Sequence, residues 1–267
     1  MGRTSLLNVH RLISEAEKVM NPEDVANAFL ADLNRCIVLS AKAGRSGKPT
    51  PTYKPSSMTC IRNMYYQVIS EDQDEEDESP DFIGIGHSGT DRHERIQNAV
   101  QAMKDHGMDC EYIDVAEFVK QRNLTDLEVV EKCGNETKLI HKVYNLRFLC
   151  DGIIKYKGKY YILEIKTEAS FKWMNRTGVD PSHYDQATAY SLSFGLDGVL
   201  FVYENRDVCS KKAYLFTVTP LMRSNLAHRI QTCDTYVERR IAPPKPEDVP
   251  KKTCSYCKYK RACRRDK

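Results

Sequence analysis

The stretch that most constrains the fold runs from Asn145 to Thr167 (NLRFLCDGIIKYKGKYYILEIKT). Apolar and β-branched residues flank Lys157-Gly158-Lys159, and glycine is a residue that tight hairpin turns favour, so the stretch predicts two β-strands joined by a turn. Three ionisable side chains, Asp151, Glu164 and Lys166, interrupt these otherwise apolar strands. Charged groups in core strands are costly unless something pairs them.

Strand side chains alternate between two faces, so Glu164 and Lys166 are expected on one face and Ile165 on the other. If Asp151 faces them, two carboxylates and a lysine meet at one point. Carboxylate oxygens suit Mg²⁺ or Mn²⁺, and the carbonyl of Ile165 would add another oxygen. Such an ion activates water for phosphodiester hydrolysis. On pattern alone, a surface strand with alternating charges has about equal weight.

Composition narrows the class of protein. The chain has 267 residues, which fits one domain with appendages or two small domains. No apolar run approaches the roughly 20 residues of a membrane span, and the polar start Met1-Gly-Arg-Thr is no signal peptide. We therefore expect no membrane association and a cytoplasmic or nucleoid-associated protein, or a phage-encoded one that acts in the host cytoplasm. The ten cysteines then indicate metal ligands or free thiols rather than a disulfide scaffold.

Periodicity predicts a mixture of helices and strands, and hence an α/β or α+β sheet covered by helices. Loops are predicted at 42–57 (a linker), 71–79 (a mobile acidic loop) and 84–89 (a glycine-rich turn). The predicted helices span 5–41 (two helices), 57–68, 90–107, 114–122, 181–194 and 221–241. Besides the opening stretch, the predicted strands span 110–115, 139–145, 198–204 and 213–219.

The cysteines near the C-terminus have metal-ligand spacing. Cys254, Cys257 and Cys263 form C-x2-C-x5-C, which leaves a four-coordinate site one ligand short. Cys60 is the candidate fourth ligand, for zinc or for an iron–sulfur cluster. The remaining cysteines have no such spacing and are expected to be buried thiols: Cys36, Cys110, Cys133, Cys150, Cys209 and Cys233.

Basic and aromatic residues alternate in two segments. Segment 251–267 has eight basic residues against one acid, with Tyr256 and Tyr259 among them. This composition suits a phosphate backbone beside aromatic surfaces for unpaired bases, or, alternatively, a solubilising tail. Segment 171–176 (FKWMNR) is predicted to be a similar loop that holds a substrate strand near the metal.

Four motifs occur in a fixed order: Gly89…His93 at a helix start, Asp151-Gly152, Glu164-Ile165-Lys166, and Gln186…Tyr190 on a helix. In this order the chain resembles the PD-(D/E)XK nucleases over about residues 85–205. The likeness is to the RecB-type branch, which includes the nuclease domains of RecB and AddB and the CRISPR-associated adaptation exonucleases. One departure is Cys150, which stands where the motif has proline.

The resemblance implies roles for these residues. His93, Asp151 and Glu164, with the Ile165 carbonyl, would bind Mg²⁺ or Mn²⁺, and Glu94 would replace or join His93. Lys166 would be catalytic, and Gln186 and Tyr190 would line the site and contact DNA or orient the lysine. The iron–sulfur members of the branch carry one cysteine before the nuclease motifs and three after them. The resemblance therefore implies a [4Fe–4S] cluster on Cys60, Cys254, Cys257 and Cys263, with zinc as the alternative.

The implied fold is a restriction-endonuclease-like core, a central mixed β-sheet flanked by helices, at 81–241. A helical extension would occupy 1–50, and a cysteine-cluster subdomain would join 51–80 to 242–267. The implied function is a metal-dependent DNA exonuclease acting on single strands or duplex ends in recombination, repair, replication or DNA processing. The alternatives are a non-catalytic DNA-binding subunit of a helicase or recombination complex and a zinc-ribbon-like nucleic-acid protein. A helicase or recombination protein and a second copy of the chain are the expected protein partners.

Overall fold

The computed structural model describes residues 22–44, 50–74, 79–247 and 249–266. Its contacts divide the chain into a helical unit (Met1–Gly47 and Asp77–Ile85) and a core unit (Lys48–Glu76 and Gly86–Lys267). The described part of the helical unit comprises α2 (Pro22–Ala43) and the N-terminal end of α4 (Pro80–Ala102). The helix predicted before residue 21 lies outside the described residues. No helix in the described ranges combines the length and the apolar character that a membrane span requires.

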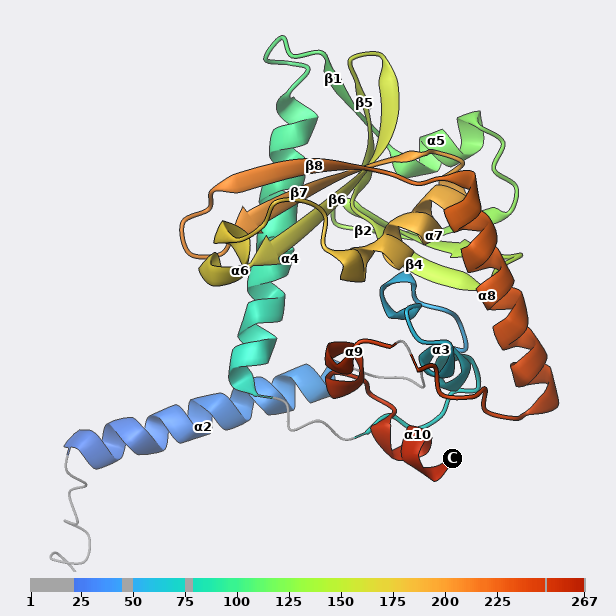
Figure 1. Ribbon diagram of the computed structural model, residues 1–267. Coiled ribbons are helices and arrows are strands. Elements are labelled where there is room, and N and C mark those ends of the chain that lie inside the picture. The colour runs from blue at the N-terminus through green and yellow to red at the C-terminus, as the bar shows by residue number, and fades with distance from the viewer. Residues whose placement is uncertain (1–21, 45–49, 75–78, 248, 267) are drawn as a thin grey trace, which may run out of the picture. The chain divides into compact units, whose positions relative to one another are not determined.

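A five-stranded sheet forms the centre of the core unit (Figure 1). Its order is β1-β5-β6-β7-β8, and only β6 and β7 run parallel. A parallel pair needs a crossover, which α6 (Ser170–Met174), η2 (Pro181–His183) and α7 (Tyr184–Phe194) provide. The strands are β1 (Cys110–Ile113), β5 (Gly152–Tyr156), β6 (Lys159–Glu168), β7 (Gly198–Asn205) and β8 (Lys211–Thr217).

Helices cover both faces of this sheet. On one face, Ile96 of α4 packs with Leu163 and Ile165 of β6. On the other face, α7 and α8 (Pro220–Arg239) belong to the main apolar core, and Figure 1 shows them across the sheet from α4. The predicted mixed sheet flanked by helices is therefore confirmed, in agreement with a restriction-endonuclease-like fold. The remaining helices are η1 (Pro55–Ser57), α3 (Ile61–Val68), α5 (Val115–Gln121), α9 (Lys251–Ser255) and α10 (Lys260–Arg265).

The first strand of the opening stretch is in fact two strands. β4 (Leu146–Cys150) belongs to a small antiparallel sheet with β2 (Leu127–Cys133) and β3 (Glu136–His141), in the order β2-β3-β4. β5 begins two residues later in the large sheet. The chain changes sheets at Asp151, so the single strand predicted there was wrong. The hairpin turn itself is confirmed: Tyr156 pairs with Lys159, and Lys157 and Gly158 take positive φ values of 48° and 78°.

The small sheet contains a strand that was not predicted. β2 is the outer strand, and all of its side chains after Leu127 are exposed. The pairing of β2 with β3 shifts between Val129 and Glu131, which marks an irregularity of the β-bulge kind. An exposed edge strand has no apolar alternation to detect, because neither of its faces has to be apolar.

The glycine-rich turn predicted at 84–89 is wrong, whereas the described residues 71–74 of the acidic loop are irregular as predicted, and the predicted linker contains packed residues. Helix α4 begins at Pro80, where Ser79 Oγ accepts the amide of Asp81 at 3.2 Å. The helix then continues through the glycines at 84–89. In the predicted linker, Tyr53 is fully buried and pairs with Leu146, so this part is packed into the core. In the acidic loop, Asp74 accepts the amides of residues 260 and 261, which connects this loop to α10, and the mobility of the loop stays a prediction.

Candidate active site

Three side chains from different elements meet where the chain passes from the small sheet to the large sheet. His93 lies on α4, Glu136 starts β3, and Asp151 joins β4 to β5; one ligand atom from each lies within 4.8 Å of the other two. His93 Nδ1 is 3.3 Å from Asp151 Oδ1 and 3.4 Å from Glu136 Oε1. Burial alone would lower the pKa of His93, but these two carboxylates raise it to about 10. An imidazole and two carboxylates form a donor set that fits a divalent metal.

Asp151 is fixed at both its side chain and its backbone. Its Oδ2 accepts the amide of Ile165 at 2.6 Å. Its carbonyl oxygen accepts a hydrogen bond from Gln97 Nε2 at 2.7 Å and lies 3.2 Å from the hydroxyl of Tyr112. Gln97 is 1% exposed, so its amide cannot easily exchange this bond for water. These contacts place Asp151 Oδ1 toward His93 before any ion binds.

A second group lies on the α7 side of β6. Lys166 Nζ is 2.5 Å from Glu164 Oε1 and donates to Gln186 Oε1 at 3.0 Å. Gln186 Nε2 lies 2.8 Å from both Glu164 Oε1 and the Tyr190 hydroxyl, and that hydroxyl donates to the carbonyl of Leu149 at 3.0 Å. The expected common face of Glu164 and Lys166 is confirmed, and α7 turns Gln186 and Tyr190 to that face.

Burial controls the charges in this second group. It raises the pKa of Glu164 to about 7 against the opposing charge of Lys166. Burial would lower the pKa of Lys166, but the neighbouring Glu164 carboxylate raises it above its ordinary value. Glu164 Oε2 is buried and has no hydrogen-bond partner among the described residues. A buried carboxylate oxygen without a partner is costly, so this atom fits a site for a cation.

The structure brings the predicted residues together in two linked groups. Glu164 stands outside the group of His93, Glu136 and Asp151, and the bond from Ile165 to Asp151 connects the two. Glu94 is exposed and also lies outside that group. Metal ligation by the carbonyl of Ile165 remains a prediction.

Glu136 was not predicted from the sequence. The residue follows the turn of the β2–β3 hairpin, and no motif includes it. The hairpin tip is held in place, since Asn135 Nδ2 donates to Asn98 Oδ1 at 2.7 Å and the Asn135 carbonyl lies 3.2 Å from the Tyr112 hydroxyl. An acid beside a short turn is the one signal that could have suggested it.

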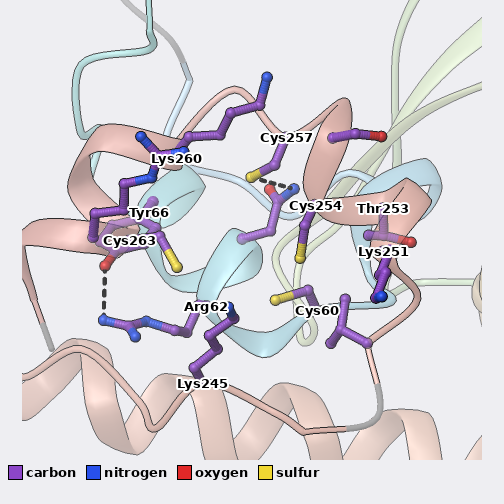
Figure 2. Close-up of a pocket in the computed structure, with 14 residues that line it drawn as sticks. Cys60, Arg62, Tyr66, Lys245, Lys251, Thr253, Cys254, Cys257, Lys260 and Cys263 are labelled. Atoms are coloured by element: carbon purple, nitrogen blue, oxygen red, sulfur yellow. Dashed lines mark hydrogen bonds between the residues drawn. The ribbon is translucent and has the colours of Figure 1, made fainter.

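The four cysteines with metal-ligand spacing line one cavity of about 520 Å³, the cysteine cavity (Figure 2). Cys60 precedes α3, Cys254 lies in α9, Cys257 follows it, and Cys263 lies in α10. Burial raises the pKa of the Cys60 and Cys257 thiols, and the nearby cysteines add to this rise. A bound metal centre would reverse this effect, because it binds thiolates.

The cysteine cavity is strongly basic. Among the described residues, its lining includes no aspartate or glutamate, and it contains five basic residues: Arg62, Lys245, Lys251, Lys260 and Arg264. Arg62 is buried, and its Nε has no hydrogen-bond partner among the described residues. Such a lining fits an anionic occupant such as a thiolate-bound metal centre.

Two predictions about other residues need correction. Cys110, Cys150 and Cys233 are buried as expected, but Cys36, Cys133 and Cys209 are exposed because they lie on the outer surface of α2, at the end of the edge strand β2 and in a turn. Tyr259 is 3% exposed and packs on Tyr66, so it offers no open surface to a base.

Segment 171–176 is also not an open basic loop. Most of it forms α6, and its charges are paired with acids: Lys172 Nζ lies 3.0 Å from Glu168 Oε1 and 2.8 Å from Asp180 Oδ2. Arg176 donates to both oxygens of Glu168. Phe171 is the exposed aromatic residue of this segment, whereas Trp173 packs against the main core and has Lys212 Nζ over its ring, 4.4 Å from the centroid.

Comparison with known proteins found distant structural likenesses. No protein-family model and no curated protein matches this chain. The crystal structure of SSO0001 is similar over 90% of this chain and 98% of its own, with 14% identity and a TM-score of 0.44. An alkaline exonuclease (LHK-Exo) from Laribacter hongkongensis is similar over 72% of this chain and 90% of its own, with 11% identity and a TM-score of 0.43. Its complex with dAMP gives a TM-score of 0.42.

Proposed function

We propose that this protein is a metal-dependent DNA nuclease that acts as an exonuclease on single-stranded DNA or duplex ends. The observation that carries the proposal is the buried, unpartnered Glu164 Oε2 beside a charged Lys166 and next to the group of His93, Glu136 and Asp151. Burying this many charges is costly, and a structural ion pair needs no free carboxylate oxygen. The arrangement therefore supports a site for a cation and a phosphodiester.

Glu164 and Asp151 each have one carboxylate oxygen that is bound within the protein and one that is available to a ligand. Glu164 Oε1 faces Lys166 and Gln186, which leaves Oε2 free. Asp151 Oδ2 accepts the amide of Ile165, which leaves Oδ1 toward His93. A bound Mg²⁺ or Mn²⁺ would polarise the scissile phosphate and lower the pKa of the attacking water.

Lys166 is suited to stabilise charge rather than to remove a proton. Its ammonium has three N–H donors; two lie toward Glu164 and Gln186, and the third can reach a phosphate oxygen. Since Glu164 raises the pKa of Lys166, the amine stays protonated at neutral pH. Tyr190 and Gln186 keep Glu164 and Lys166 in register, which is a positioning role.

For the cysteine cavity we propose a [4Fe–4S] cluster on Cys60, Cys254, Cys257 and Cys263, with zinc as the alternative. The shared cavity, the basic lining and the spacing of the cysteines support this assignment. Iron and sulfide in chemical analysis, with a brown protein, are expected. A colourless protein with one zinc per chain would favour the alternative.

The nuclease is tested with end-labelled linear DNA and Mn²⁺. We expect Asp151→Asn and Lys166→Met each to lower the cleavage rate by about 100- to 1,000-fold, the usual effect of losing one group that stabilises transition-state charge. Glu131→Gln, an exposed change on β2, is the control and should cleave like the wild type. Circular single-stranded DNA should resist cleavage if the enzyme needs an end. Equal cleavage by all the variants, or DNA binding without cleavage in any metal, would contradict the proposal.

A further inference from the structure

Three hollows in the core unit share residues and follow one another. The central hollow, of about 500 Å³, is lined by parts of segments 56–63, 180–182 and 250–257, and shares Asn63, Thr253 and Cys257 with the cysteine cavity. The α6 hollow, of about 690 Å³, is lined by 171–172, 175–181 and Tyr184, and shares residues 180 and 181 with the central hollow. The shared lining residues place the three hollows next to one another, and we call the three together the depression.

Exposed aromatic rings lie along this depression. Among the phenylalanine, tyrosine and tryptophan side chains described in the core unit, the most exposed are Phe171 (79%), Tyr256 (70%) and Tyr184 (37%). Tyr256 lines the central hollow, and Phe171 and Tyr184 line the α6 hollow. The Tyr184 ring stacks on the Phe216 ring, with 4.5 Å between the ring centroids and 18° between the ring planes. Large rings left open to solvent in one place are typical of a binding surface.

The polar groups of the depression change along its length. The cysteine cavity at one end is basic, with no acid among the described residues that line it. The central hollow offers hydroxyls from Ser56, Ser57, Thr59, Ser182 and Thr253, with Asp180 as its one acid. In the α6 hollow Lys172 and Arg176 are paired with acids, so aromatic contact dominates there. Cations and hydroxyls can contact a phosphate backbone, and the exposed aromatic rings beside them can stack on unpaired bases.

We propose that this depression is a track for single-stranded DNA, in which bases stack on Tyr256, Tyr184 and Phe171 and phosphates contact the hydroxyls and the basic rim of the cysteine cavity. A duplex does not fit this role, because its bases are stacked on one another and cannot reach protein rings. Tyr184 starts α7, the helix that also carries Gln186 and Tyr190, so the track borders the element that lines the catalytic group. The proposal rests on the proposed function and defines its substrate as a single strand.

Oligonucleotide binding tests the track without cleavage. Fluorescent oligo(dT) is titrated with the full chain in Ca²⁺, and anisotropy gives Kd for wild type, Phe171→Ala, Tyr256→Ala and the double variant. Loss of one stacked base weakens single-strand binding by about 5- to 100-fold, so each single variant should fall in this range and the double variant further. Phe82→Ala, an equally exposed ring in the helical unit, is the matched control and should stay within about twofold.

The outcomes separate the track from the nuclease. If Phe171→Ala and Tyr256→Ala bind oligo(dT) as tightly as the wild type, the track is wrong, whatever the cleavage assays show. If both variants weaken binding while the wild type cleaves nothing in any metal, the track stands and the nuclease fails. A blunt duplex that binds as tightly as the single strand, and loses affinity equally in the variants, would also overturn the assignment to a single strand.

Discussion

The acid site, formed by His93, Glu136, Asp151, Glu164 and Lys166, differs from the cysteine cavity in the contacts that hold its side chains in place. At the acid site, Asp151 accepts hydrogen bonds from Ile165 and Gln97, Glu164 accepts one from Gln186, and Lys166 donates one to Gln186 Oε1. In the cysteine cavity, Cys257 is contacted by Asn63 Nδ2 at 3.8 Å and by the amide of Tyr259 at 3.4 Å, and the backbone amides of residues 62 and 63 contact the Cys60 thiol. The acid site is held by hydrogen bonds between the sheet and its flanking helices, whereas the four cysteines would gain a direct link to one another only from a bound metal centre.

The position of each site in the chain explains this difference. The acid site lies on β6 and on elements that contact the central sheet, so the main core organises it. The cysteines come from two segments almost 200 residues apart in the sequence: Cys60 directly precedes α3, and the other three lie in or between α9 and α10. A metal centre bound there would act as a cross-link between the two segments. The following three experiments test the contrast.

The largest effect is expected from Cys60→Ser. Losing this ligand removes the cross-link between α3 and the C-terminal helices, which the loop-closure model values at about 5 kcal/mol for so long a loop. Urea unfolding and metal analysis should show both a lower stability and a loss of bound metal. Cys36→Ser, on the exposed surface of α2, is the control and should change neither. Unchanged stability and metal content in Cys60→Ser would contradict the dependence of this cavity on its ligand.

A smaller effect is expected at the acid site from Gly152→Ala. A Cβ at this position would lie 2.5 Å from Cε2 of Tyr112, so the ring that contacts the Asp151 carbonyl would have to move. Overpacking of this kind costs about 1–3 kcal/mol. Thermal unfolding should show this loss, and Mn²⁺ titration should show weaker binding. Gly178→Ala, where a Cβ meets nothing within 4 Å, should behave like the wild type. Wild-type Mn²⁺ affinity in Gly152→Ala would mean that the scaffold does not set the metal site.

The smallest effect, counted per pH unit, concerns acid conditions. Burial, with Lys166 nearby, lowers the pKa of His183 to about 3, and its Nδ1 lies 2.9 Å from the Tyr203 hydroxyl. An unfolded histidine titrates near 6.5, so between about pH 6.5 and 3 the unfolded chain binds the extra proton. Stability from this group is therefore complete above pH 6.5 and falls as the pH is lowered, by at most about 1.4 kcal/mol per pH unit. Urea unfolding of the metal-free protein should show a shallower acid dependence in His183→Gln.

His228→Gln, an exposed change on α8, is the control for this pH series. It should keep the wild-type slope. An identical acid dependence in wild type and His183→Gln would contradict the role of His183.

Local patterns in the sequence predicted the parts of the fold that local forces determine. Alternation along β6 predicted the common face of Glu164 and Lys166, and Pro181 and Gly195 marked the ends of the η2–α7 segment. The change of sheets at Asp151 could not be found in this way, because it depends on Ile165 and Gln97, which are distant in sequence. Glu136 was missed for the same reason: only tertiary contacts of its hairpin bring it to His93.

The edge strand β2 has a further consequence for the behaviour of the protein in solution. Its outer side has unpaired backbone groups that could pair with another chain, and Val129 and Val130 are exposed beside them. The shift in pairing after Val129 and the charges of Glu128, Glu131 and Lys132 work against such pairing. The hairpin that carries Glu136 thus also carries its own protection against aggregation, and apolar replacements of these charges would lower solubility before they affected the fold.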